Sequence, residues 1–311
     1  MTFAMVFPGQ GSQVVGMLMA FSEYPEIKQS FGEASKVLDY DLWALTQQGP
    51  DDRLNATERT QPALLTAGVA LWRVWQGRHG SIPAYMAGHS LGEYTALVCS
   101  GVIEFKTAVK LVEFRGQAMQ QAVPPGIGTM AAILGLEDGA VRNACAEAAH
   151  GQVVEAVNFN APGQVVIAGS KAAVERAIEA CLARGAKRAI ALPVSVPSHC
   201  ALMKPAAEQL AAWLTGIKLA RPAIPVIHNV DVTTHTEPDA IKRVLKDQLH
   251  NPVRWVETIQ FLAHQGVTRF VELGPGRVLA GLIKRIDKSL ETYSVYDPQT
   301  LEAALAAVKN P

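Results

Sequence analysis

The sequence has no excess of charge of either sign. Its 311 residues include 28 Lys and Arg and 28 Asp and Glu, so the formal net charge is zero with histidine neutral. A neutral chain creates no global field that attracts nucleic acid or an anionic membrane. We therefore expect neither as a partner, although the overall balance leaves local basic patches open.

Long apolar runs and clustered cysteines are also missing. The first apolar run ends at Pro8 without a basic segment before it, and no later run approaches the roughly 20 residues of a membrane helix. The chain has four widely spaced cysteines and no CxxC pair, namely Cys99, Cys145, Cys181 and Cys200. We expect no signal peptide, no membrane span, no disulfide framework and no metal site, and a reducing, cytoplasmic setting.

Hydrophobic residues are plentiful, at 49% of the chain. They form short apolar runs that alternate with stretches of helical spacing, which is typical of an α/β fold. We expect strands at residues 2–7, 84–88 and 268–274, and helices at 62–78, 91–101, 105–122 and 277–286.

The middle of the chain has its own pattern of elements. The order β-α-β-β-α-β is expected, with the elements at 129–134, 137–150, 153–160, 164–169, 171–184 and 186–194. This order is the ferredoxin-like signature. It predicts a small ferredoxin-like domain at 126–195, inserted into a larger α/β domain formed by 1–125 and 196–311. One continuous sheet is the alternative.

The stretch GHSLGEY at 88–94 lies between an expected strand and an expected helix. That context favours a nucleophile elbow, a tight turn that presents Ser90 at a helix N-terminus. Gly88 and Gly92 would keep side chains out of the strand–helix contact, and the N–H of Leu91 would face an oxyanion. An ordinary small-residue turn into a helix is the other interpretation.

A serine nucleophile needs a base, and His199 is the best candidate among eight histidines. It opens an apolar helical stretch, and a helix N-terminus disfavours the imidazolium. His89 is given a supporting role at most, and His228 and His235 have no special context. No Asp or Glu between Ser90 and His199 has a context that marks it as the third member of a catalytic triad, so a backbone or amide carbonyl could orient the ring. The remaining four histidines are expected on the surface.

Arg115 shares one face of the expected helix 105–122 with Val112 and Met119. That face is otherwise apolar, so the arginine is either a structural ion-pair partner or a ligand for a substrate carboxylate. The spacing alone favours the structural ion pair. The glycine-rich loop FPGQGSQ at 7–13 could add an oxyanion donor; it lacks the Lys-Ser/Thr of a phosphate-binding loop.

Several motifs together resemble one family. They are FPGQGSQ, GHSLGEY, the Arg115 helix, FNAPGQVVIAG (159–169), SVPSHCALM (195–203), QLHNPVRW (248–255) and FVELGPGRVLAGL (270–282). Over nearly its whole length the chain is similar to the malonyl-CoA:acyl-carrier-protein transacylases. The resemblance implies an α/β-hydrolase-like large domain with the small ferredoxin-like subdomain.

The resemblance also implies a set of site residues. Ser90 would be the acylated nucleophile, His199 its base and Gln248 the residue that orients the histidine. Arg115 would grip the malonyl carboxylate, in place of the structural role favoured by its spacing. The backbone N–H groups of Gln10 and Leu91 would form the oxyanion hole, and Met119, Asn160 and Gln61 would lie near the acyl pocket.

The implied substrates are malonyl-CoA and acyl carrier protein, without a cofactor or metal, and a monomer is expected. A hydrolase on the same core and a non-catalytic docking module for a carrier protein are the competing interpretations. A polyketide pathway is an alternative to fatty-acid synthesis.

Overall fold

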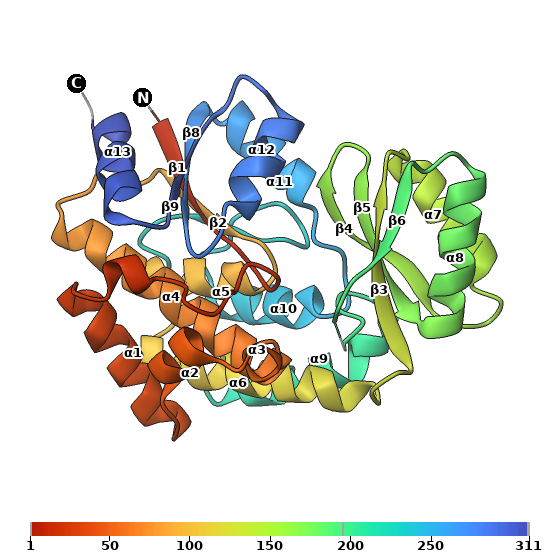
Figure 1. The fold of residues 1–311 in the computed structure, drawn as a ribbon, viewed down its shortest axis with the longest axis horizontal. Coiled ribbons are helices and arrows are strands. Elements are labelled where there is room, and N and C mark those ends of the chain that lie inside the picture. The colour runs from red at the N-terminus through yellow and green to blue at the C-terminus, as the bar shows by residue number, and fades with distance from the viewer. Residues whose placement is uncertain (1, 195, 310–311) are drawn as a thin grey trace.

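The computed structural model of the protein describes residues 2–194 and 196–309. Within these residues the chain forms two separate sheets, one parallel and one antiparallel. Figure 1 shows the two sheets in adjacent lobes, with both chain ends on the lobe of the parallel sheet. The expected α/β class is confirmed, and the alternative of one continuous sheet is wrong.

Five parallel strands form the larger sheet, in the order β7-β2-β1-β8-β9. They are β1 (Thr2–Phe7), β2 (Tyr85–Gly88), β7 (Val226–Ile227), β8 (Val267–Leu273) and β9 (Glu291–Val295). The central β1 is continuously apolar because a strand inside a parallel sheet is buried on both faces. Phe3, Met5 and Phe7 enter one core, and Ala4 and Val6 enter the other.

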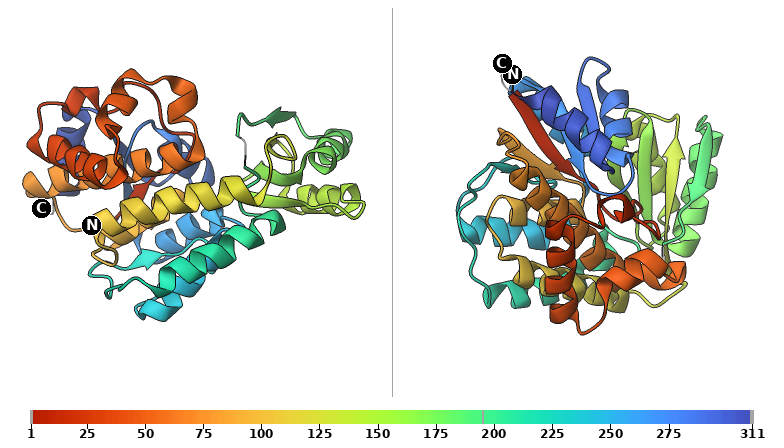
Figure 2. Two further views of the ribbon diagram at one scale, coloured as in Figure 1. Left: turned by 90° about the horizontal axis from the view of Figure 1, so that it is seen from below. Right: turned by 60° about the vertical axis from the view of Figure 1, so that its left-hand side comes forward.

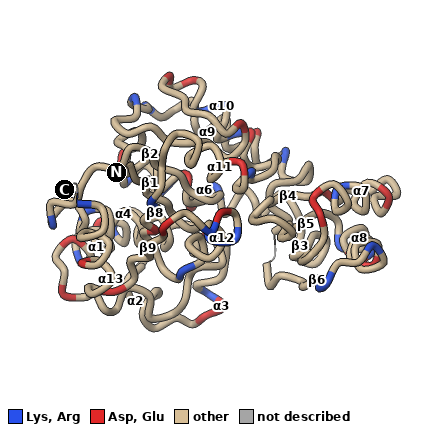
Figure 3. The backbone as a smooth tube through the Cα atoms, turned by 90° about the horizontal axis from the view of Figure 1, so that it is seen from above, with Lys and Arg blue, Asp and Glu red and all other residues tan. Residues whose placement is uncertain are grey.

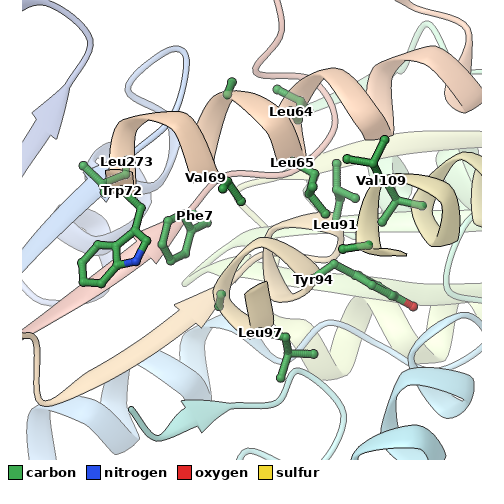
Figure 4. Close-up of a cluster of buried hydrophobic side chains, with 14 of the residues drawn as sticks. Phe7, Leu64, Leu65, Val69, Trp72, Leu91, Tyr94, Leu97, Val109 and Leu273 are labelled. Carbon is green, nitrogen blue, oxygen red and sulfur yellow. The ribbon is translucent and has the colours of Figure 1, made fainter. Parts of the chain in front are cut away.

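Helices cover both faces of this sheet. On the first face lie α4 (Thr57–Gly77) and α5 (Leu91–Cys99), and α6 (Phe105–Ala122) packs against both of these helices. On the second face lie α11 (Trp255–His264) and α12 (Val278–Ile286). Figure 4 shows the apolar cluster between α4, β1 and α5, with Phe7, Leu65 and Leu91 among its members. This packing fixes the end of β2, where the chain turns into α5.

The lobe of the parallel sheet contains further helices. They are α1 (Pro25–Leu38), α2 (Leu42–Gln48), α3 (Asp51–Leu54), α9 (Lys204–Thr215), α10 (Pro238–Gln248), α13 (Pro298–Val308) and the short 3₁₀ turns η1 (Met19–Phe21) and η2 (Ala201–Met203).

The second sheet has the expected order of elements along the chain. They are β3 (Gly128–Leu134), α7 (Asp138–Ala148), β4 (Val154–Ala161), β5 (Gln164–Ser170), α8 (Lys171–Ala183) and β6 (Arg188–Ala191), and the strands pair antiparallel in the order β4-β5-β3-β6. Helices α7 and α8 cover one face. The opposite face buries Met130 and Val157 against Cys200, which follows His199. Figure 2 shows α6 extending from the larger lobe to the start of this sheet.

Two expected elements differ from the observed bounds by more than two residues at one end. Helix α4 begins at Thr57 rather than at residue 62, so Pro62 lies inside it. Strand β6 is shorter than the expected 186–194 because only Arg188–Ala191 pair with β3. Residues 1, 195, 310 and 311, which include limits of the expected domains and the first residue of SVPSHCALM, lie outside the described residues.

Candidate active site

Ser90 occupies a strained turn between β2 and α5. Its backbone has φ 50° and ψ −106°, a conformation that is costly for a residue with a side chain. A Cβ on Gly88 would overlap the backbone of Gly92, and a Cβ on Gly92 would overlap the carbonyl of Phe7. Both positions therefore require glycine, as expected from the sequence.

The side chain of Asn229 stabilises this turn through two hydrogen bonds, and Asn229 was not predicted from the sequence. Its Oδ1 accepts a hydrogen bond from the N–H of Ser90 at 2.8 Å, and its Nδ2 donates to the carbonyl of Gly88 at 2.7 Å. Asn229 follows the short strand β7, which neighbours β2 in the sheet. Its position at the carboxyl edge of the sheet, where α/β ligand sites lie, was the available signal.

His199 meets the serine from a distant part of the chain. Its Nε2 lies 2.8 Å from Ser90 Oγ, and its Nδ1 lies 2.7 Å from the main-chain carbonyl of Gln248. Because a carbonyl only accepts, Nδ1 carries the proton and Nε2 is free to accept from the serine hydroxyl. The ring is thus oriented by a backbone carbonyl, one of the options that the sequence left open.

Burial keeps the His199 imidazole neutral. The pKa of His199 is lowered to about 3, first by desolvation and then by the positive charge of Arg115. The helix N-terminus invoked from the sequence is not the principal cause. His199 precedes a 3₁₀ turn of three residues, Ala201–Met203, and helix α9 begins only at Lys204.

Arg115 is buried in α6, with 1% of its surface exposed. Its guanidinium donates to Gln61 Oε1 at 2.8 Å, to Gln248 Oε1 at 3.0 Å and to Ser90 Oγ at 3.3 Å. Among the described residues its Nε has no hydrogen-bond partner, and the guanidinium lies over the ring of Tyr94. Within residues 2–194 and 196–309 no carboxylate forms a salt bridge with it, so the structural ion pair favoured by spacing is wrong.

A cavity opens beside these groups. It is lined by Gln10, His89, Ser90, Leu91, Arg115, Met119, Met130, Asn158, Leu192, Val194, Val196, Ser198 and His199. Leu91 is the first residue of α5, so its N–H is one of the helix donors without an intrahelical acceptor. Gln10 follows β1, and its side chain donates to Thr57 at 3.3 Å.

Two residues expected at the acyl pocket do not line this cavity. Gln61 lies behind Arg115, where its amide also contacts the sulfur of Met119 at 3.6 Å. Asn160 Oδ1 lies 2.7 Å from His89 Nε2, and burial lowers the pKa of that histidine. Asn158, which was not considered from the sequence, contributes to the lining instead. Residues two apart in a strand point the same way, so the bulge in β4 near these positions alters which one faces the cavity.

A buried polar network lies beneath the elbow, and sequence reasoning missed it as well. Glu93 is fully buried and accepts from Gln248 Nε2 at 2.8 Å and from the N–H of Asn229 at 3.0 Å; its Oε1 lies 2.7 Å from His228 Nδ1. His228 therefore does have a specific context. The signal was a lone acid, inside GHSLGEY, on an otherwise apolar helix.

The geometry and the comparisons define an acyltransferase. A family model described as an acyl transferase domain matches residues 4–299. The malonyl CoA-acyl carrier protein transacylase of Escherichia coli strain K12 is 61% identical over 305 residues, covering 97% of this chain and 98% of the relative. The protein of that name from Bacillus subtilis strain 168 is 44% identical, covering 98% and 97%. The chain belongs to the family of malonyl CoA-acyl carrier protein transacylases.

Solved structures agree with this assignment. The crystal structure of an acyl carrier protein S-malonyltransferase from Vibrio cholerae matches with a TM-score of 0.96 and 61% identity, covering 98% of this chain and 100% of that chain. A malonyl-transacylase in complex with a type II polyketide acyl-carrier protein matches with a TM-score of 0.98 and 58% identity, covering 99% and 100%.

In residues 2–194 and 196–309 no helix is long and apolar enough to cross a membrane. The same residues contain no group of three or more His, Cys, Asp or Glu arranged to hold a metal ion. Figure 3 shows basic and acidic residues interspersed over both lobes.

Proposed function

We propose that the protein transfers a malonyl group from malonyl-CoA to the phosphopantetheine thiol of acyl carrier protein, through a malonyl-Ser90 intermediate. The observation that carries the proposal is the buried guanidinium of Arg115, which lies only 3.3 Å from the serine oxygen and forms no salt bridge with a carboxylate of the described residues. An acyl group with a terminal carboxylate would complete that site. The names of the relatives, which specify malonyl CoA and acyl carrier protein, support the same substrates.

In the first half-reaction, His199 Nε2 takes the proton of Ser90 while Oγ attacks the thioester carbonyl carbon. The N–H groups of Gln10 and Leu91 would stabilise the oxyanion. When the C–S bond breaks, the imidazolium returns the proton to the leaving sulfur, and CoA departs as a thiol. Gln248 keeps Nδ1 protonated throughout.

In the second half-reaction, the carrier thiol gives its proton to His199 and attacks the ester carbonyl. The C–O bond to Ser90 then breaks, and the serine recovers the proton. Because one product leaves before the second substrate enters, the kinetics are ping-pong. The oxyanion hole carries the developing charge in both halves, so the proposed reaction uses no cofactor.

The carboxylate would also strengthen the base. Burial and, after it, the charge of Arg115 lower the pKa of His199 in the unliganded enzyme. A malonyl carboxylate on Arg115 neutralises that charge, so the pKa of His199 rises when the acyl group is malonyl and not when it is acetyl. Selectivity then acts on the chemical step as well as on binding.

We also propose the domain description drawn from the sequence. An α/β-hydrolase-like domain comprises 1–125 and 196–311, and a ferredoxin-like subdomain comprises 126–195. The order β4-β5-β3-β6, with α7 and α8 on one face, supports the second part. A monomer and a cytoplasmic location stay predictions.

Intact-protein mass spectrometry after addition of malonyl-CoA tests the proposal. A malonyl adduct that persists until acyl carrier protein is added identifies a transferase, and Ser90→Ala should form none. An adduct lost rapidly to water would identify a hydrolase, and the absence of any adduct would favour a docking module. Comparing fatty-acid and polyketide carriers as acceptors addresses the pathway, because one similar protein is complexed with a polyketide carrier.

A further inference from the structure

The positive charge of Arg115 is connected to a negative charge through one amide. Gln248 Oε1 accepts from Arg115 at 3.0 Å, and Gln248 Nε2 donates to Glu93 Oε2 at 2.8 Å. Arg115, Gln248 and Glu93 are each at most 1% exposed. The carboxylate therefore lies near the guanidinium and does not touch it.

The donors around Glu93 hold it in this position. Its Oε2 accepts from two N–H groups, those of Gln248 and Asn229, and its Oε1 is bound to His228 Nδ1. A buried guanidinium without any countercharge is costly. A carboxylate in direct contact would lower that cost but would occupy the donors that a substrate carboxylate needs.

We infer that Glu93 is a positioning residue for substrate selectivity: it supplies the countercharge of Arg115 at one amide's distance and leaves the guanidinium open to the acyl carboxylate. The inference rests on the proposed malonyl transfer. In the unliganded enzyme Glu93 stabilises the charged Arg115. In the malonyl-enzyme the malonyl carboxylate does so directly, and Glu93 becomes less important.

Glu93→Gln removes the charge and can keep the hydrogen bonds. The introduced carbonyl can accept from Gln248 and Asn229, while the introduced NH₂ donates to His228 Nδ1. That contact needs the other tautomer of His228, with the proton on Nε2, an atom that has no hydrogen-bond partner among the residues that the structure describes. The substitution therefore tests charge rather than shape.

The experiment compares the thermal midpoint Tm of the free and malonylated enzymes, with malonylation verified by intact mass. We expect Glu93→Gln to lower the Tm of the free enzyme more than that of the malonyl-enzyme. Malonylation should raise the variant's Tm by at least about 3 °C more than it raises the wild-type Tm. Acetylation, which adds no carboxylate, should give no such excess.

Glu272→Gln is the matched control. Glu272 is also buried, at 1% exposure, and it caps α12 by accepting from the N–H groups of Leu279 and Ala280. Because this carboxylate has a purely structural role, its removal should lower the Tm of the free and malonylated enzymes equally. Equal losses for Glu93→Gln would overturn the inference.

A second variant keeps the inference testable if Glu93→Gln does not fold. The exchange variant Glu93→Gln with Gln248→Glu keeps a single carboxylate in this network and places it directly on Arg115, so the ratio of kcat/KM for malonyl-CoA over acetyl-CoA should fall at least tenfold. An unchanged ratio would contradict the inference. If the wild type forms no malonyl adduct, the proposed function itself fails, and the inference fails with it.

Discussion

The sharpest prediction concerns the removal of the guanidinium. In Arg115→Ala the malonyl carboxylate enters the cavity without its partner, next to Met119 and Leu91. Removing one member of a buried ion pair costs about 3–5 kcal/mol because the other charge remains uncompensated. Every 1.36 kcal/mol changes a rate tenfold, and water can enter this open cavity, so the lower part of that range applies. We expect kcat/KM for malonyl-CoA to fall by about 10²–10³.

Acetyl transfer by the same variant should not decrease. An acetyl group has no carboxylate for Arg115 to bind, so the substitution removes no interaction that this substrate uses. The kcat/KM for acetyl-CoA should therefore stay unchanged or rise, and the malonyl preference should disappear. Both rates can be measured by release of the CoA thiol with acyl carrier protein as acceptor.

A matched control separates selectivity from general damage. Arg73 is a partly buried arginine that bonds Ser30 and Glu33, away from the cavity. Arg73→Ala should lower stability and leave the malonyl-to-acetyl ratio unchanged. If Arg115→Ala retained the wild-type ratio, the carboxylate-binding role would be refuted.

Three further predictions concern the elbow and the base. Gly92→Ala should unfold the protein or make it insoluble, because the added Cβ overlaps the backbone of β1. Gly281→Ala, whose Cβ meets nothing within 4 Å among the described residues, should fold normally. Circular dichroism of both variants checks this prediction. Asn229→Ala should lower kcat/KM for malonyl-CoA and acetyl-CoA alike by about tenfold, the effect of a lost hydrogen bond on the nucleophile turn, and a changed ratio would argue against it. Because burial lowers the pKa of His199 to about 3 from 6.5, the unfolded chain binds a proton that the folded chain does not. The free energy of unfolding should therefore decrease as the pH falls from 6.5 toward 3, by up to about 1.4 kcal/mol per pH unit. His199→Asn should show a shallower slope in denaturant titrations, and identical slopes would contradict the assignment.

Much of the fold and part of the site could be predicted from local sequence. β1 and α6 were located correctly because a doubly buried strand is continuously apolar and an amphipathic helix repeats every 3.6 residues. The elbow was predictable because two glycines around a serine, between a strand and a helix, form a local steric device. These features depend on residues close together in the chain.

The partners of Arg115 could not be predicted in this way. Its spacing on an apolar face indicated burial, yet the same spacing fits an ion pair equally well. Only the fold shows that its neighbours are the amides of Gln61 and Gln248, from α4 and α10. The resemblance to a family, and not the spacing, supplied the proposal that Arg115 binds the substrate carboxylate.

The sequence by itself determined the α/β class, the order of the elements and the candidate nucleophile, because each follows from periodicity or from turn geometry over a few residues. Tertiary structure alone decided that the main-chain carbonyl of Gln248, rather than its side-chain amide, orients His199. It also decided that Asn229 binds the N–H of Ser90 and that the amide of Gln248 lies between Glu93 and Arg115. These hydrogen bonds join residues more than 45 positions apart, and they form only because the sheets and helices pack together. The spacing of residues along the chain does not reveal which distant residues come into contact.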